Sequence, residues 1–151
     1  IDTLGINRNG HMFLTDTNGS GGLPVPTDYD FWFGVDGDRA FGGDGDGDGN
    51  DGVFLYRETD GFVYYTNETP VGPGGVATTA DNFFFGIASD SFVSGDWDRD
   101  GVDTAGIFRG SDTTVYWSNT NASGGAAAPT DGSYVWGTDG WTPVAGVPGL
   151  T

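Results

Sequence analysis

The sequence contains no cysteine and no lysine, and it has one histidine and one methionine among 151 residues. Without cysteine, neither disulfides nor thiolate metal sites can form. Because lysine is absent, the five basic residues are all arginine, and 22 acidic residues bring the net charge to −17. A chain with this charge repels phosphate backbones and anionic membranes, so we expect no nucleic-acid partner. No apolar run is long enough to span a membrane, so we expect no membrane insertion.

The chain also lacks any sustained helical spacing of apolar residues. Glycine occurs 29 times, and each glycine inside a helix costs about 1 kcal/mol relative to alanine. Hydrophobic residues make up 36% and aromatic residues 15% of the sequence, which is enough for a packed core. The composition therefore predicts an all-β domain with short strands and many turns.

An internal repeat covers the whole chain. Gly34, Gly86 and Gly137 are spaced by 52 and 51 residues, and each is followed nine residues later by another glycine. This spacing predicts one domain of three four-stranded, propeller-blade-like units of about 50 residues, namely 1–49, 50–101 and 102–151. The expected strands are residues 4–8, 11–15, 31–34 and 40–43, then 54–57, 62–66, 83–86 and 92–95, then 106–109, 114–118, 134–137 and 143–146.

Some of the expected strands are apolar without interruption. Residues 54–56 and 83–85 are continuous rather than alternating, which predicts strands that are covered on both faces. Small sheets stacked face to face, as in a β-propeller, provide such an environment. The long segments at 17–27, 67–80 and 119–130 are rich in Gly, Pro, Ala and Thr, and we expect them to be surface connections.

Two acidic loops with the pattern D-x-D-x-D-G-x-D are the most specific motif in the sequence. They span residues 44–51 and 96–103 and lie 52 positions apart. Carboxylates at alternate positions of a tight turn direct oxygens to one centre, which suits Ca²⁺, while the glycine permits the reversal of the backbone. We expect two calcium sites. They differ from an EF-hand, because neither loop has a glutamate at the position that is the twelfth of an EF-hand loop. The expected ligands are Asp44, Asp46, Asp48, Asn50 and Asp51 in the first loop, and Asp96, Asp98, Asp100, Val102 and Asp103 in the second, with Asn50 and Val102 each offering a backbone carbonyl.

The segment from Gly95 to Arg109, with the preceding residues 85–90, resembles the FG-GAP/VCBS-type repeats of extracellular proteins. The resemblance extends over all three units. It implies β-propeller blades with a calcium loop between strands, in secreted or surface-attached proteins that are often adhesive or appended to enzymes. Three units are fewer than such propellers commonly have, and the first loop has no residue like Trp97. A β-trefoil, which also contains three four-stranded repeats, is the alternative fold.

The third unit lacks an acidic loop. Residues 147–151 stand where the loop would begin, and residues 1–3 match residues 102–104, at the end of a loop. The two ends are therefore complementary, which predicts either a ring closed within one chain or head-to-tail self-association into a homopolymer. A fragment of a longer array would show the same division.

Other repeated residues have simpler interpretations. Arg8, Arg57 and Arg109 occupy one repeat position, where we expect each guanidinium to pair with a nearby Asp or with loop carbonyls. Each unit also contains one N-x-S/T sequence, a candidate glycosylation site, although the same residues are favoured in ordinary turns. The three asparagines are Asn18, Asn67 and Asn121.

Catalysis finds little support in the sequence. The single histidine, His11, occupies a position that Phe62 and Thr114 fill in the other units, and no Ser/His/Asp arrangement suggests a triad. We therefore expect a non-enzymatic, calcium-stabilised structural or adhesive protein, such as a filament or surface-layer subunit. A carbohydrate-binding, lectin-like module with tryptophans stacked on glycans and a fragment of a larger secreted propeller protein are the alternatives.

We expect an extracellular location, because loops of weak-to-moderate affinity fill at the millimolar calcium found outside cells. A start at Ile1 rather than Met is consistent with removal of a signal peptide, as well as with a cloned fragment.

Overall fold

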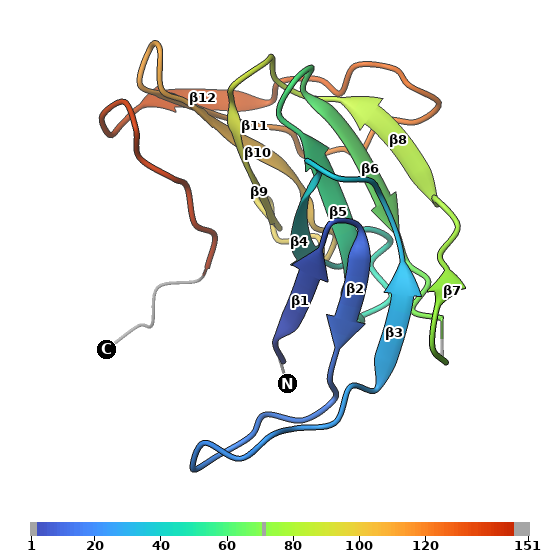
Figure 1. Ribbon diagram of the computed structural model, residues 1–151. Coiled ribbons are helices and arrows are strands. Elements are labelled where there is room, and N and C mark those ends of the chain that lie inside the picture. The colour runs from blue at the N-terminus through green and yellow to red at the C-terminus, as the bar shows by residue number, and fades with distance from the viewer. Residues whose placement is uncertain (1–2, 71, 147–151) are drawn as a thin grey trace.

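The computed structural model describes residues 3–70 and 72–146, which form β-strands and no helix (Figure 1). The prediction of an all-β fold is confirmed. Since the described residues form no helix, none of them forms a helix that is long and apolar enough to cross a membrane.

The strands form three separate four-stranded sheets, as the repeat predicts. Sheet 1 has the order β1 (Gly5–Arg8), β2 (His11–Leu14), β3 (Tyr29–Trp32) and β7 (Gly75–Val76). Sheet 2 has the order β4 (Arg39–Gly43), β5 (Gly52–Arg57), β6 (Phe62–Thr66) and β8 (Asp81–Phe84). Sheet 3 has the order β12 (Gly132–Val135), β11 (Thr114–Trp117), β10 (Thr104–Arg109) and β9 (Ser91–Gly95). No barrel closes among the described strands, which does not fit the β-trefoil alternative.

The fourth strand of a sequence unit belongs to the following sheet. β4 pairs with β5, and β9 pairs with β10, both in antiparallel register. The prediction that residues 143–146 form the fourth strand of the third unit is wrong, because they form no strand. An extended segment without a neighbouring strand leaves its backbone groups unpaired, so it gains little from adopting a strand conformation.

The long segments do more than connect strands over the surface. β7, inside the segment 67–80, pairs in parallel with β3 of the preceding sheet. Ala127, inside the segment 119–130, forms a parallel bridge to Phe84 in the same way. Each of these segments therefore reaches back to the outer edge of the sheet before its own.

Two hydrophobic cores lie between neighbouring sheets. The core between sheets 1 and 2 includes Met12, Phe31 and Leu55. The core between sheets 2 and 3 includes Val63 and Phe83, together with residues from β5, β9 and β10.

The prediction of strands covered on both faces is confirmed for one of the two apolar runs. In β5, residues 54–56 are all at most 1% exposed. In the run 83–85 the prediction is wrong for Phe84, which is 40% exposed while its neighbours are buried. Phe84 lies at the end of β8, where its ring packs edge-on against Phe62 rather than inside a core.

Candidate metal centres

The first acidic loop connects β4 to β5 and gathers three carboxylates. One oxygen each from Asp44, Asp46 and Asp48 lies within 4.8 Å of the others. Gly47 and Gly49 have φ angles of 76° and 88°, a backbone region that other residues rarely adopt. These glycines allow the chain to reverse so that alternate carboxylates converge.

Asp44 holds this loop in shape through its two carboxylate oxygens. Its Oδ1 accepts hydrogen bonds from the N–H groups of Gly47 at 2.7 Å and Asp48 at 3.2 Å, and its Oδ2 accepts one from Gly49 at 2.7 Å. Burial raises the pKa of Asp44, but the backbone N–H donors outweigh burial, and the net pKa is lowered. Asp44 is therefore an ionised carboxylate already surrounded by donors.

The second acidic loop, between β9 and β10, repeats this arrangement. Asp96, Asp98 and Asp100 bring one oxygen each within 4.8 Å of one another. Asp96 accepts from the N–H groups of Arg99 at 2.6 Å and Gly101 at 3.0 Å. Arg99 adopts a φ of 68° at the position of Gly47 in the first loop, so the hydrogen bonds of Asp96 hold a left-handed residue that is not glycine.

The remaining predicted ligands make other contacts. Asn50 donates from its backbone and side chain to Asp48 Oδ1, at 2.8 and 3.1 Å. The Val102 N–H donates to Asp100 Oδ1 at 2.9 Å. The structure thus brings together the first three carboxylates of each predicted set, while Asp51 and Asp103 lie outside the two clusters. The contacts of Asn50 and Val102 involve their N–H groups, so their backbone carbonyls as calcium ligands stay a prediction.

Asp103 instead links the two loops. Its N–H donates to Asp44 O at 2.7 Å, and its Oδ2 accepts from Asp44 N–H at 2.8 Å. Burial raises the pKa of Asp103, and the negative charges of Asp51, Asp44 and Asp96 raise it further, against the opposing hydrogen bond from Asp44. A cation near either loop would relieve this repulsion.

The three N-x-S/T asparagines differ in their surroundings. Asn18 is exposed. Asn67 is exposed and donates from Nδ2 to Asp46 Oδ2 at 2.7 Å, so it contacts the first acidic loop. Asn121 is half-buried and donates from Nδ2 to Asp103 O at 2.9 Å. A glycan is attached through Nδ2, so the half-buried Asn121 is the least accessible candidate.

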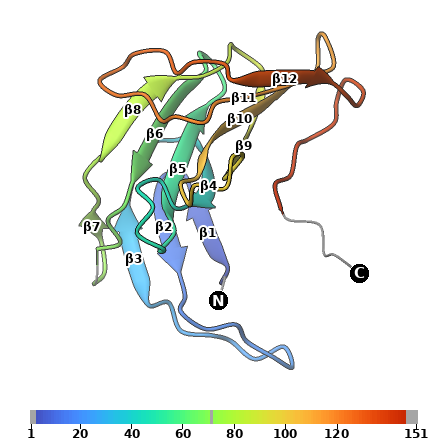
Figure 2. The same cartoon turned by 180° about the vertical axis from the view of Figure 1, so that it is seen from behind.

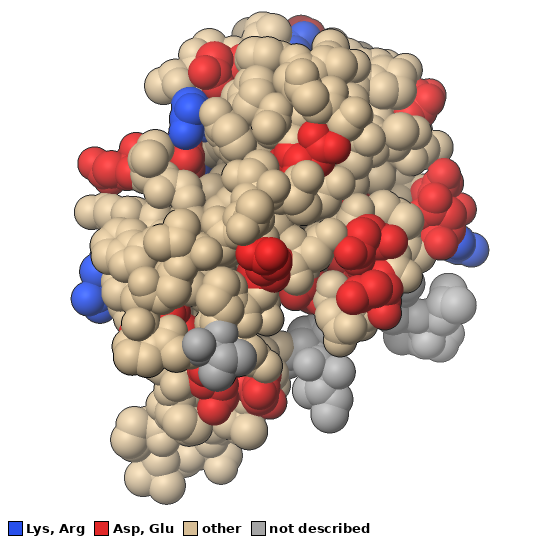
Figure 3. Space-filling view, turned by 90° about the vertical axis from the view of Figure 1, so that its right-hand side faces the viewer, with Lys and Arg blue, Asp and Glu red and all other residues tan. Residues whose placement is uncertain are grey.

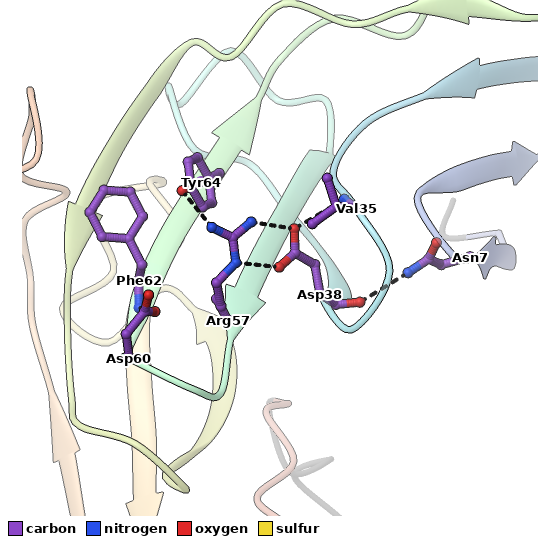
Figure 4. Close-up of polar contacts among 7 residues, drawn as sticks. All are labelled: Asn7, Val35, Asp38, Arg57, Asp60, Phe62 and Tyr64. Carbon is purple, nitrogen blue, oxygen red and sulfur yellow. Dashed lines mark hydrogen bonds and ion pairs between the residues drawn. The ribbon is translucent and has the colours of Figure 1, made fainter.

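Two of the three repeated arginines form ion pairs with buried aspartates, as predicted. Arg57 Nε and Asp38 Oδ1 lie 2.8 Å apart, and Arg57 also donates to the Tyr64 hydroxyl at 2.9 Å (Figure 4). Arg109 pairs with Asp90 at 2.7 Å. Asp38 and Asp90 are not among the residues predicted from the sequence, although each precedes its arginine by 19 residues, a spacing that could have revealed them.

Arg8 is the exception among the repeated arginines. It lies over the Phe13 ring at 5.4 Å, and no carboxylate partner is present among the described residues. Trp141 occupies the repeat position of Asp38 and Asp90.

The single histidine takes part in a structural contact. His11 Nε2 lies 2.6 Å from Asp30 Oδ1, and its ring stacks on Trp32 at 4.2 Å. Asp30 O and Oδ1 also accept the Gly74 N–H, which precedes β7. His11 therefore supports the attachment of β7 to sheet 1.

Acidic side chains dominate the charged surface. Figure 3 shows one face of the molecule with several separate groups of Asp and Glu and few basic side chains. This distribution follows from a net charge of −17, and a bound divalent cation would offset part of it.

Comparison with models of known protein families gives no match, and searches of curated proteins and of solved structures give no match either. The resemblance to FG-GAP/VCBS-type repeats therefore rests on the motif alone.

Proposed function

We propose that this protein is a non-enzymatic, calcium-stabilised structural or adhesive protein of the extracellular space, whose copies join head to tail into a filament or surface layer. The observation that carries the proposal is the convergence of three carboxylates in each acidic loop. Calcium prefers such oxygen ligands, with further sites filled by backbone carbonyls and water. The role of the ion is to neutralise the clustered aspartates and to fix neighbouring sheets relative to each other.

The contact between the two loops supports a role where sheets 2 and 3 meet. The first loop joins β4 to β5 within sheet 2, and the second loop joins β9 to β10 within sheet 3. The hydrogen bonds between Asp103 and Asp44 connect the loops to each other. In this proposal the three sheets are successive propeller-like blades of the FG-GAP/VCBS type, and calcium stiffens the contact between the two loops and so between sheets 2 and 3.

Calcium-dependent unfolding tests the proposal. We expect the melting temperature to rise when calcium is added to metal-free protein and to fall when a chelator is added, because an ion that binds only the folded state stabilises it. The double variant Asp46→Asn/Asp98→Asn should lose most of this shift. The double variant Asp36→Asn/Asp139→Asn removes the same two charges at exposed positions outside the loops and should keep it. If calcium and chelator leave the melting temperature and assembly unchanged, the proposed role of calcium is wrong.

A carbohydrate-binding function is the second candidate, favoured by exposed aromatic side chains near β12. Tyr134 and Trp136 are 49% and 63% exposed, with ring centroids 6.2 Å apart. Aromatic faces of this kind can stack on sugar rings. A glycan array separates the candidates, because sugar-specific binding that Trp136→Ala abolishes would support the lectin-like function, whereas a structural subunit should give no such binding.

A further inference from the structure

We propose that a second copy of this chain docks with its sheet 1 against sheet 3 of the first copy, while residues 142–146 of the first copy add a strand beside β1 of the second. This inference rests on the head-to-tail association in the proposed function and supplies its surfaces and register. Its basis is that the two junctions inside the molecule are repeats of each other, and the halves of a third such junction remain exposed.

The two hydrophobic cores are built from equivalent positions. Each joins two aromatic side chains at the end of the third strand of a sequence unit, β3 or β8, to an aliphatic side chain from an interior strand of the next sheet, β5 or β10. These residues are Phe31, Phe33 and Leu55 in one core, and Phe83, Phe85 and Ile107 in the other. All six are at most 5% exposed.

The third set of equivalent residues is split between the two ends of the molecule. Tyr134 and Trp136 on sheet 3 occupy the aromatic positions and are 49% and 63% exposed. Ile6 on sheet 1 occupies the aliphatic position and is 64% exposed, and nearby Leu4 is 79% exposed. Bringing sheet 1 of one copy onto sheet 3 of another would bury these four side chains as the two internal junctions bury theirs.

The open edge of β1 can pair with a further strand. β1 is an edge strand, whereas β5 and β10 at the same repeat position are interior strands. The Phe33 N–H donates to Gly10 O, and this bond fixes which residues of sheet 1 form hydrogen bonds with which neighbouring strand. Because bonded and non-bonded pairs alternate along an antiparallel ladder, Ile6 forms its backbone hydrogen bonds with β2. Gly5 and Asn7 instead direct their N–H and C=O groups to the open edge.

Residues 142–146 match the missing strand, including at their proline. They correspond to β4 and β9 in the repeat, and Val144 is 91% exposed. In the register of β4 on β5, Val144 would lie opposite Gly5, and Pro143 opposite Ile6. The Ile6 position faces β2 for its hydrogen bonds, so its partner on the other side needs no N–H, and proline is tolerated there.

The turn that leads into this segment already has the conformation found before β4 and β9. The Trp141 N–H donates to Thr138 O at 3.1 Å, as Asp38 donates to Val35 at 3.2 Å. Gly137 has a φ of 93°, close to the 91° of Gly34. This turn therefore leads into residues 142–146 as the equivalent turns lead into β4 and β9, which begin the following sheets.

A second contact involves residues 17–27, the long segment of sheet 1. In both internal junctions the equivalent segment of the following sheet pairs in parallel with the outer strand of the preceding sheet, through an N–H of Ala77 or Ala128. Val25 is the equivalent of these alanines and is 40% exposed. Residue 24 is a proline, at the position of Ala127. The bridge at Ala127 is made by its neighbours, because the Ala128 N–H donates to Phe84 O and the Phe84 N–H donates to Ala126 O, both at 2.9 Å, so proline fits this position. Residues 23–25 can therefore pair with β12 of another copy.

The second of these contacts does not form within one molecule. β12 is at one end of the molecule and the loop at residues 15–28 is at the opposite end, in both of two views related by rotation about the vertical axis (Figures 1 and 2). A junction that uses both contacts therefore requires a second copy. At this junction Arg8 would meet Trp141 instead of an aspartate, and a guanidinium can stack on an indole ring.

Mixing two charged variants tests the surfaces. Ile6→Asp should disable only the sheet 1 half, and Trp136→Asp only the sheet 3 half. In sedimentation velocity experiments with calcium, we expect each variant alone to show association weakened at least tenfold and their mixture to form heterodimers. Because both side chains are exposed in the single molecule, neither change should affect its folding, which circular dichroism can check. Val76→Asp, a control at a side chain that is 75% exposed outside the split core, should associate normally.

Cysteine cross-linking tests the register in a chain that has no natural cysteine. Leu4 falls opposite Ala145 in a non-bonded pair, where Cα atoms lie about 4.5 Å apart and a disulfide can form. Mixed single variants Leu4→Cys and Ala145→Cys should give a cross-linked heterodimer, whereas Leu4→Cys mixed with Val144→Cys, one residue out of register, should not.

The outcomes separate this inference from the proposed function. An intrachain bond in the double variant without cross-linking in the mixture would overturn the inference in favour of closure within one molecule. Assembly that persists in both charged variants would overturn these surfaces while leaving head-to-tail association in place. A wild-type chain that stays monomeric at all concentrations with calcium would overturn both. Register-specific cross-linking that is indifferent to chelator would support the inference and overturn only the role of calcium.

Discussion

The carboxylate of Asp38 is held by the guanidinium of Arg57 through two hydrogen bonds of 2.8 and 3.0 Å, while the Asp38 side chain is only 2% exposed. Asp38 lies in the turn before β4, and Arg57 ends β5. The pair therefore fastens the turn between sheets 1 and 2 to the second sheet.

Replacing Arg57 by glutamine should destabilise the protein by about 2–3 kcal/mol, because a buried carboxylate would lose its charged partner. Urea unfolding monitored by tryptophan fluorescence measures this change. Arg39→Gln is the matched control, since Arg39 and Glu58 form an exposed pair in the same sheet, and it should cost less than about 1 kcal/mol. Equal losses for the two variants would show that burial does not distinguish these pairs.

Asp44→Asn should destabilise the metal-free protein by about 1–2 kcal/mol, because a neutral amide offers one oxygen where the carboxylate accepts three backbone N–H bonds. Asp98→Asn provides the control, since Asp98 is exposed and no hydrogen bond to its side chain is present in the described residues. It should leave the metal-free protein unchanged or slightly more stable, because it removes a like charge. Thermal unfolding in chelator compares them, and an equal loss would contradict a capping role for Asp44.

The sequence predicted the strands better than their partners. Repetition of glycine and arginine located nearly all of the strands, because turns and strand ends impose those residues locally. It did not reveal that β4 pairs with β5 across the first acidic loop rather than with its own unit, because a short apolar strand fits either neighbour. β7 was missed because Gly75 and Val76 form a strand only through contact with β3.

The acidic clusters were predicted in the same partial way. Alternation along the loop fixes where Asp44, Asp46 and Asp48 point, so their convergence followed from the motif. The bond of Asp103 to Asp44 joins residues 59 positions apart, and its formation depends on how sheets 2 and 3 pack. Spacing within a single loop carries no information about such a contact.

Gly52→Ala should be strongly destabilising, by about 3 kcal/mol, because a Cβ at this position would lie 2.1 Å from the Thr66 carbonyl oxygen and backbone atoms cannot easily move apart. Gly42→Ala in the neighbouring strand is the control. Its Cβ would meet nothing closer than 4.0 Å, so it should change stability by less than about 1 kcal/mol. Chemical denaturation measures both changes, and a neutral Gly52→Ala would mean that β5 and β6 lie further apart at this end.

Tyr56 should make the protein sensitive to alkaline pH. Burial raises the pKa of the Tyr56 hydroxyl well above its ordinary value of 10.0, and the charges of Asp90 and Glu58 raise it further. Because the folded pKa is the higher one, the neutral hydroxyl favours the folded state below pH 10, and this stability is lost as the pH rises above 10 and the unfolded chain ionises. The loss for this single group should approach about 1.4 kcal/mol per pH unit. Tyr56→Phe removes the ionisation while keeping the ring, which stacks on Phe92 at 5.0 Å, so it should flatten the decline of unfolding free energy between pH 10 and 11. Tyr134→Phe, at a tyrosine that is 49% exposed, should leave the decline unchanged, and an equal effect of the two substitutions would show that burial of Tyr56 does not govern the alkaline transition.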